Sequence, residues 1–243
     1  MVPSLLLMCN RKYLYLIKYT NIKMSKIEIA CFNPESAIIA FENGADRIEL
    51  CDGLSEGGTT PGFEVTRQLR EKINIPLFVM IRPRGGDFTY SETEFEQMKE
   101  DLIRLKSLNV DGFVFGILDE NDEVNVEQNK ALVELASPLF CTFHRAFDRA
   151  RGLEESLEKV IDCGFRTILT SGQKPNVSEG KENLKKLVEL SGGRIEILVG
   201  GGLRSSNIEE IRSVTQAGYF HSSAITDGGA FANPDEVVAL KSK

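Results

Sequence analysis

Apolar runs of five or six residues recur eight times along the chain, and a segment with helical periodicity follows each of them. The runs predict buried strands at residues 27–32, 46–51, 77–82, 112–117, 139–144, 165–170, 195–200 and 219–223. Eight strand–helix units in one domain, residues 26–243, favour an α/β fold with a single (β/α)8 TIM-type barrel. A doubly wound open sheet is the alternative, but it does not require eight regular units.

The segments between the strands begin with residues that typically start helices. Asn33 followed by Pro34 predicts one helix, which ends near Gly44. Ser91 and Glu94 form a capping-box pattern before a helix that runs to about Leu108. The remaining predicted starts are Pro61, Asn125, Gly152, Ser178, Ser206 and Asn233.

Alternation along each strand assigns side chains either to the barrel interior or to the surrounding helices. Ile27 and Ile29 face the helices, so Glu28 points inward and Cys31 outward. The same argument predicts inward side chains at Arg47, Glu49, Cys51, Arg82, His144, Ile168, Thr170, Glu196 and His221. Buried charges without partners cost several kcal/mol, so the charged members of this set must pair or bind a ligand.

Position along the strands divides these polar residues into two groups. Glu28, Arg47 and Glu196 lie near the N-terminal ends, and we assign them to structure. The others lie at the C-terminal ends, where barrels of this type carry their functional sites.

The loop after the third predicted strand combines two arginines, two glycines and an acid. Arg82 and Arg84 offer planar donors for anionic oxygens, Gly85 and Gly86 allow close approach of the backbone, and Asp87 follows them. The loop therefore indicates part of a binding site. The alternative is that both arginines only form structural ion pairs.

Three later loops at the same predicted end are also rich in polar groups. His144, Arg145 and Asp148 follow the fifth strand, and Ser171 follows the sixth. Both histidines of the chain fall at predicted strand ends, which favours function over a structural role. Free amides in the Gly-rich segment after the seventh strand suit an anion, with a tight turn as the alternative. The candidate ligand-binding residues there and on the eighth strand are Gly201, Gly202, His221 and Ser222.

Composition narrows the possible partners. The net charge of −7 argues against general nucleic-acid binding, so the arginines must act locally. No apolar run approaches the roughly 18 residues needed to span a membrane. The five cysteines, at positions 9, 31, 51, 141 and 163, lack disulfide or zinc spacing and are expected to be reduced thiols.

Residues 1–25 differ from the rest of the chain. Residues 1–27 contain five basic residues and no acidic one. We expect residues 1–25 to form a poorly packed extension, with Met24 as an alternative translation start. A mitochondrial targeting role is the alternative for this segment.

Several motifs together resemble the CutC copper-homeostasis family. They are residues 44–51 (GADRIELC), 55–61 (SEGGTTP), 82–88 (RPRGGDF), 142–148 (TFHRAFD) and 169–172 (LTSG). The resemblance covers roughly residues 26–225. It implies a (β/α)8 barrel that binds copper, contributes to copper tolerance, is cytoplasmic (the nucleus being a second possibility) and forms a homo-oligomer, a dimer or a tetramer. No enzymatic activity is firmly attached to the family.

The resemblance places copper ligands at Cys31 and Cys51, which end the first and second predicted strands. Cuprous ion favours thiolates, and neighbouring strands are about 4.8 Å apart. The opposite predicted orientations of the two side chains mean that the first strand must bend for the thiols to converge. The alternative is that both cysteines are small buried hydrophobic residues.

A different functional class is also open. The chain could be a lyase or isomerase acting on a small phosphorylated or carboxylated substrate. Glu49 or His144 would then be the acid or base, Asp148 would orient a neighbour, and Arg82 or Arg84 would neutralise developing charge. No inward lysine is predicted, which disfavours a Schiff-base aldolase.

Overall fold

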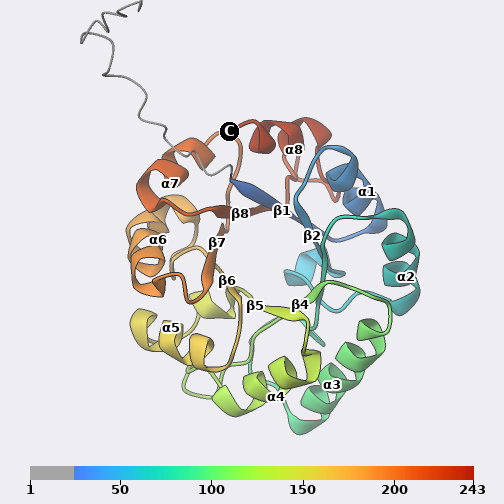
Figure 1. Cartoon of the computed structure of the whole chain (residues 1–243), viewed down its shortest axis with the longest axis vertical. Coiled ribbons are helices and arrows are strands. Elements are labelled where there is room, and N and C mark those ends of the chain that lie inside the picture. Colours follow the sequence, from blue (N-terminus) through green and yellow to red (C-terminus); the bar gives the residue numbers. More distant parts are fainter. Residues whose placement is uncertain (1–24) are drawn as a thin grey trace, which may run out of the picture.

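The computed structural model describes residues 25–243, and these form a closed barrel of eight parallel strands inside a ring of eight α-helices (Figure 1). Strands β1 to β8 are neighbours in chain order, and β8 pairs with β1 to close the sheet. The predicted (β/α)8 barrel is thus confirmed. The expectations for residues 1–24, including Met24 and Cys9, lie outside the described residues.

Apart from β1, the strands are shorter than the apolar runs that predicted them, because the chain leaves the sheet soon after each last paired residue. Their bounds are β1 Lys26–Cys31, β2 Arg47–Leu50, β3 Leu77–Met80, β4 Gly112–Phe115, β5 Phe140–Phe143, β6 Thr167–Thr170, β7 Glu196–Gly200 and β8 Tyr219–Ser222. Several predicted site residues therefore stand on the first residues of loops.

Most helices begin where the capping signals predicted. Their bounds are α1 Pro34–Glu42, α2 Phe63–Lys72, α3 Glu92–Lys106, α4 Val126–Ala136, α5 Leu153–Asp162, α6 Val177–Ser191, α7 Ile208–Thr215 and α8 Pro234–Lys241. The capping box of Ser91 and Glu94 is present. The helices predicted to start at Pro61, Ser178 and Ser206 begin one or two residues away, at Phe63, Val177 and Ile208. At α6 the reason is that the Asn176 side chain accepts from the amides of residues 178 and 179.

The predicted orientations hold for most strands but not for β6. Leu169 lines the central cavity, whereas Ile168 belongs to the apolar layer between strands and helices. Register explains the error, since Leu169 pairs with Leu198 of β7, which has the inward phase. Glu196 was also wrongly predicted to be interior, because it is the first residue of β7 and is exposed at the N-terminal rim.

Side chains fill the N-terminal end of the barrel interior. Arg47 forms an ion pair with Glu28, and both residues are buried. The Arg47 guanidinium lies 4.2 Å from the ring centre of Phe78 and 4.5 Å from that of Tyr219. The structural role predicted for Glu28 and Arg47 agrees with this arrangement. The space available to a ligand therefore lies toward the C-terminal end.

None of the helices within residues 25–243 combines the length and the apolar character that crossing a lipid bilayer requires.

Candidate functional site

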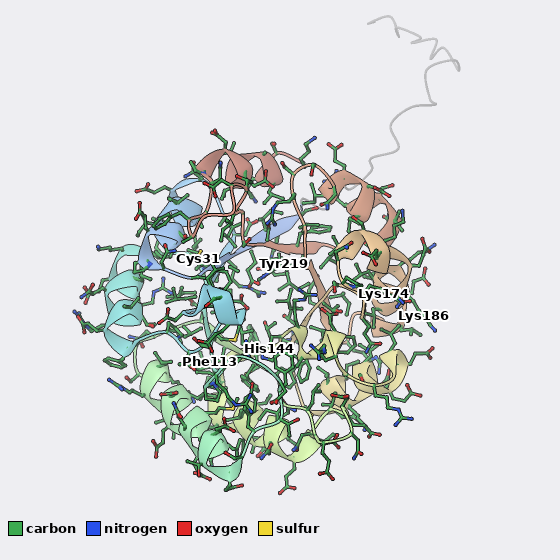
Figure 2. The ribbon with its side chains drawn as sticks, turned by 180° about the vertical axis from the view of Figure 1, so that it is seen from behind. Cys31, Phe113, His144, Lys174, Lys186 and Tyr219 are labelled. Carbon is green, nitrogen blue, oxygen red and sulfur yellow. The ribbon has the colours of Figure 1, made fainter. Side chains whose placement is uncertain are left out.

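A cavity of about 310 Å³ lies at the C-terminal end of the barrel, and the loops after the strands form its walls. Figure 2 shows His144 toward the middle of the ring, with Lys186 on its outside. The predicted site residues that line the cavity are Glu49, Arg82, His144, Arg145, Gly201, Gly202, His221 and Ser222. Closure of the barrel thus brings together residues from five different strands or the loops that follow them.

Two carboxylates and an imidazole meet at the inner end of this cavity. His221 Nδ1 donates to Glu28 Oε1 at 2.6 Å, and His221 Nε2 lies 3.9 Å from Glu49 Oε2. One potential ligand atom from each of the three residues lies within 4.8 Å of the others. Burial opposes protonation of His221, but Glu49 and Glu28 outweigh it and raise its pKa. The cluster can hold a proton or a cation.

The two carboxyl groups of this cluster differ in acidity. Burial would raise the pKa of Glu28, but Arg47 and His221 lower it to about 2. Burial raises the pKa of Glu49 to about 7, although His221 opposes that shift. Glu49 Oε1 has no hydrogen-bond partner among the described residues. Glu49 can therefore take up or release a proton near neutral pH.

Two sulfur-containing side chains lie beside Glu49. The Cys51 thiol donates to Glu49 Oε2 at 3.6 Å, and Cys51 and Met80 belong to the same interior cluster. Both converge on Gly58, where an added Cβ would lie 3.3 Å from Cys51 Sγ and 3.5 Å from Met80 Cε. Met80 was not among the predicted site residues, although its position one residue before Ile81 gave it the inward phase.

Cys31 lies in a different environment from Cys51. It belongs to the apolar layer between strands and helices, as its predicted phase required, and its thiol is 3.5 Å from the Ile29 carbonyl oxygen. The two residues are adjacent through the backbone, since the Cys51 amide donates to the Cys31 carbonyl at 2.8 Å. Burial, followed by the charge of Glu49, raises the pKa of each thiol well above its ordinary value.

His144 is a buried neutral imidazole with one nitrogen free. Its Nδ1 accepts from the Ala146 amide at 3.3 Å, so the proton resides on Nε2, which has no partner among the described residues. Its ring centre lies 4.8 Å from that of Phe88, and the Arg82 guanidinium lies 4.8 Å from the same Phe88 ring centre. Phe88 is thus stacked between His144 and Arg82. Burial, assisted by Arg82, lowers the pKa of His144 to about 3.

The two arginines of the first candidate loop have different roles. Arg84 pairs with Asp87 at 2.9 Å and with Glu94 at 2.6 Å and does not line the cavity, nor does Asp87. For Arg84 the alternative of a structural ion pair fits best. Arg82 instead donates to the carbonyl oxygens of residues 56, 58 and 86.

Asp148 and Ser171 support the cavity from behind without lining it. Asp148 accepts from the Thr170 hydroxyl at 2.5 Å and from the Ser171 amide at 3.0 Å. It also pairs with Arg145 Nε at 2.7 Å, while Arg145 Nη2 donates to Ser171 Oγ at 2.9 Å. This network orients the Arg145 guanidinium toward Gly201, where an added Cβ would lie 3.0 Å from Arg145 Cζ.

Arg204 and Ser223 also line the cavity and were not singled out from the sequence. Arg204 Nη1 donates to Ser222 Oγ at 3.1 Å, which holds the guanidinium beside the eighth strand. The available signal was the position of Arg204 directly after the three glycines and Leu203. A second signal was the hydroxyl pair of residues 222 and 223.

Comparison with known proteins gives a consistent result. The model of the CutC family matches residues 25–226. A human protein named copper homeostasis protein cutC homolog is 44% identical over 198 residues, which cover 82% of this chain and 72% of the human one. A family protein CutC from Chromobacterium violaceum is 45% identical over 202 residues, covering 83% and 82%. The crystal structure of a CutC protein from Streptococcus agalactiae has a TM-score of 0.78 and 34% identity, covering 84% of this chain and all of that one (100%).

Proposed function

The chain belongs to the CutC copper-homeostasis family, and from this premise we propose that it binds cuprous copper and contributes to copper handling in the cell. Cu(I) prefers soft thiolate and thioether ligands and also accepts imidazole. Met80 and His221 line the cavity, and Cys51, which does not line it, packs in the same interior cluster as Met80.

The observation that carries the proposal is the Cys51 thiol. It is buried in the barrel interior, beside the Met80 thioether and 3.6 Å from Glu49. Its raised pKa keeps the thiol protonated at neutral pH without metal. Copper must displace this proton, and Glu49 is the adjacent group that can accept it.

We assign Cys31 as the second thiolate. After burial and Glu49, the third cause that raises the pKa of Cys51 is the negative charge of a Cys31 thiolate, so the two side chains are close enough to interact. The assignment requires the Cys31 side chain to leave the Ile29 carbonyl and turn toward the interior. The contact to be lost is a weak thiol hydrogen bond at 3.5 Å.

The test is a Cu(I) titration against a competing chromogenic chelator under strict reduction. All proteins carry Cys9→Ala, so that the thiol outside the described residues does not contribute. We expect one tightly bound ion per chain. Cys51→Ala and Cys31→Ala should each weaken binding by about a hundredfold or more.

Cys163→Ala is the matched control. Cys163 is also a buried free thiol, but it follows α5 and donates to the Val126 carbonyl at 3.7 Å. Its removal should leave copper affinity unchanged. If both Cys31→Ala and Cys51→Ala bind copper like the control, these residues are not the ligands. Met80→Leu, which conserves volume, then tests the thioether alone.

A further inference from the structure

The cationic side of the cavity is not neutralised by acids. Arg82 is only 4% exposed, and its guanidinium donates to carbonyl oxygens alone. Arg204 donates to the carbonyls of Leu203 and Ile225 and to two serine hydroxyls. Within residues 25–243 neither arginine has a carboxylate partner. In a chain of net charge −7, two such guanidinium groups at one cavity mark a place for an anion.

Backbone amides reinforce the positive potential near Arg204. The amides of Gly201, Gly202 and Ser223 donate to no acceptor within the part of the chain that the structure describes. Gly201 and Gly202 have φ values of +112° and +73°, which glycine adopts without strain. A Cβ at Gly201 would also lie 2.9 Å from that of Ser171, so this close approach requires glycine.

Buried polar atoms without partners lie on the other side of the same cavity. They are Glu49 Oε1, His144 Nε2 and Arg82 Nε, in residues that are 3%, 4% and 4% exposed. A buried polar atom without a partner destabilises the fold, so these atoms are poised to pair with a ligand. Glu49 offers an acceptor, whereas His144 offers a neutral N–H donor. Such a pair suits hydroxyl or carbonyl oxygens rather than an apolar group.

We propose that the cavity binds a small phosphate monoester whose organic part is a sugar or polyol. The phosphate lies against Gly201, Gly202, Ser223 and the Arg204 guanidinium, and the oxygens of the organic part face Glu49 and His144. Guanidinium, amide and hydroxyl donors approach from several directions, which suits a tetrahedral anion better than a planar carboxylate. A cavity of about 310 Å³ matches a ligand of this size.

Binding of a phosphate monoester at this cavity is distinct from the proposed copper binding and does not depend on it. The phosphate contacts come from the loops after β7 and β8, whereas the proposed thiolate ligands Cys31 and Cys51 lie on or next to β1 and β2. The two sites share only the neighbourhood of Glu49 and His221. Failure of one proposal therefore leaves the other standing.

Calorimetric titration of the full chain, kept metal-free with a chelator, tests the proposal. The probes are inorganic phosphate, glycerol 3-phosphate and ribose 5-phosphate, with glycerol and ribose as uncharged counterparts. We expect saturable binding of at least one ester, more tightly than inorganic phosphate, and no binding of glycerol or ribose. If no phosphate probe saturates, or if an uncharged counterpart binds as tightly as its ester, the proposal is wrong.

Variants separate the two halves of the ligand. Arg204→Gln should weaken every phosphate probe by at least about tenfold. Arg166→Gln is the control, because Arg166 is exposed immediately before β6, at the opposite end of the barrel. Glu49→Gln should weaken the bound ester but not inorganic phosphate. Equal losses in Arg204→Gln and Arg166→Gln would contradict the phosphate assignment, and an unchanged ester affinity in Glu49→Gln would contradict the assignment of the organic part.

A second variant covers the case in which Arg204→Gln does not fold. Ser223→Asp places a negative charge at the proposed phosphate position and should abolish binding of all phosphate probes. Circular dichroism establishes that each variant is folded. A folded Ser223→Asp protein that still binds phosphate overturns the proposal.

Discussion

At the scale of single residues, two histidines in one cavity have pKa values that are shifted in opposite directions. Burial, and after it the charge of Arg82, lowers the pKa of His144 to about 3. Burial also opposes protonation of His221, but Glu49 and the hydrogen bond to Glu28 raise its pKa. The sequence predicted that both lie at the site, but the direction of each pKa shift depends on neighbours that only barrel closure provides. The sequence motifs therefore predicted where the two histidines lie, but not how their pKa values are shifted.

The first prediction concerns the pH dependence contributed by His144. The folded chain keeps His144 neutral down to about pH 3, while the unfolded chain protonates it below its ordinary pKa of 6.5. Its burial therefore contributes stability above pH 6.5 that is lost as the pH falls toward 3. His144→Gln should flatten the fall of the unfolding free energy by up to about 1.4 kcal/mol per pH unit.

Urea denaturation followed by circular dichroism between pH 4 and 7 measures this slope. His221→Gln is the comparison, because His221 is the second of the two histidines in the chain. The pKa of His221 is raised, so its contribution is present at low pH and is lost as the pH rises above 6.5. Identical slopes in wild type and His144→Gln would show that His144 titrates normally.

At the scale of the elements, side chains from helices fix the loops that form the cavity. Asn129 on α4 is fully buried, accepts from the Ile117 amide at 3.1 Å and donates to the Ile117 carbonyl at 2.8 Å. The next residue, Leu118, donates to the Phe88 carbonyl at 2.9 Å, and Phe88 lies between Arg82 and His144. The helix thus supports the stack through the backbone of two loops.

The second prediction is that Asn129→Ala lowers the free energy of unfolding by about 2–3 kcal/mol, because it leaves buried backbone groups of Ile117 without partners. Lys130→Ala, at the neighbouring exposed position of α4, should have little effect. Urea midpoints for the two variants measure the difference. A similar midpoint for both would mean that water replaces the Asn129 side chain at no net cost.

Local patterns predicted the elements well for a physical reason. Asn33, Ser91, Asn125 and Asn233 cap helices through contacts three residues or fewer along the chain, so the sequence contains the whole interaction. Thr170 was misplaced because alternation does not reveal the register of a four-residue strand. Arg204 and Asn129 were missed because their partners are distant in sequence, at separations of 12 residues or more.

At the scale of the whole molecule, closure depends on the last helix. α8 packs against β1 and α1, and its Val237 and Leu240 are buried. Lys241 Nζ pairs with Asp46 Oδ2 at 2.7 Å, and the same oxygen accepts from the Ile27 amide at 2.6 Å. Figure 1 shows α8 beside α1, where the first and last units of the ring meet. This helix lies beyond residue 226, where the family match ends.

The third prediction is that removal of residues 233–243 abolishes cooperative unfolding, because it exposes the apolar faces of β1 and α1 that α8 covers. A chain shortened by residues 242–243 alone keeps α8 and should unfold like the full chain. Thermal circular dichroism is the appropriate measurement, since the chain contains no tryptophan. A cooperative transition in the longer truncation would contradict this role of α8.

The plug formed by Arg47, Glu28, Phe78 and Tyr219 makes the barrel a cup rather than a channel. A ligand that reaches Glu49 and Cys51 must therefore enter and leave through the same opening, at the C-terminal end of the barrel. A cavity with a single opening does not allow a ligand to pass through the barrel. It allows exchange of the ligand with a donor or acceptor that binds at the C-terminal end. An anion bound beside Arg204 would then also block this opening and slow the entry and release of a metal ion bound deeper in the barrel.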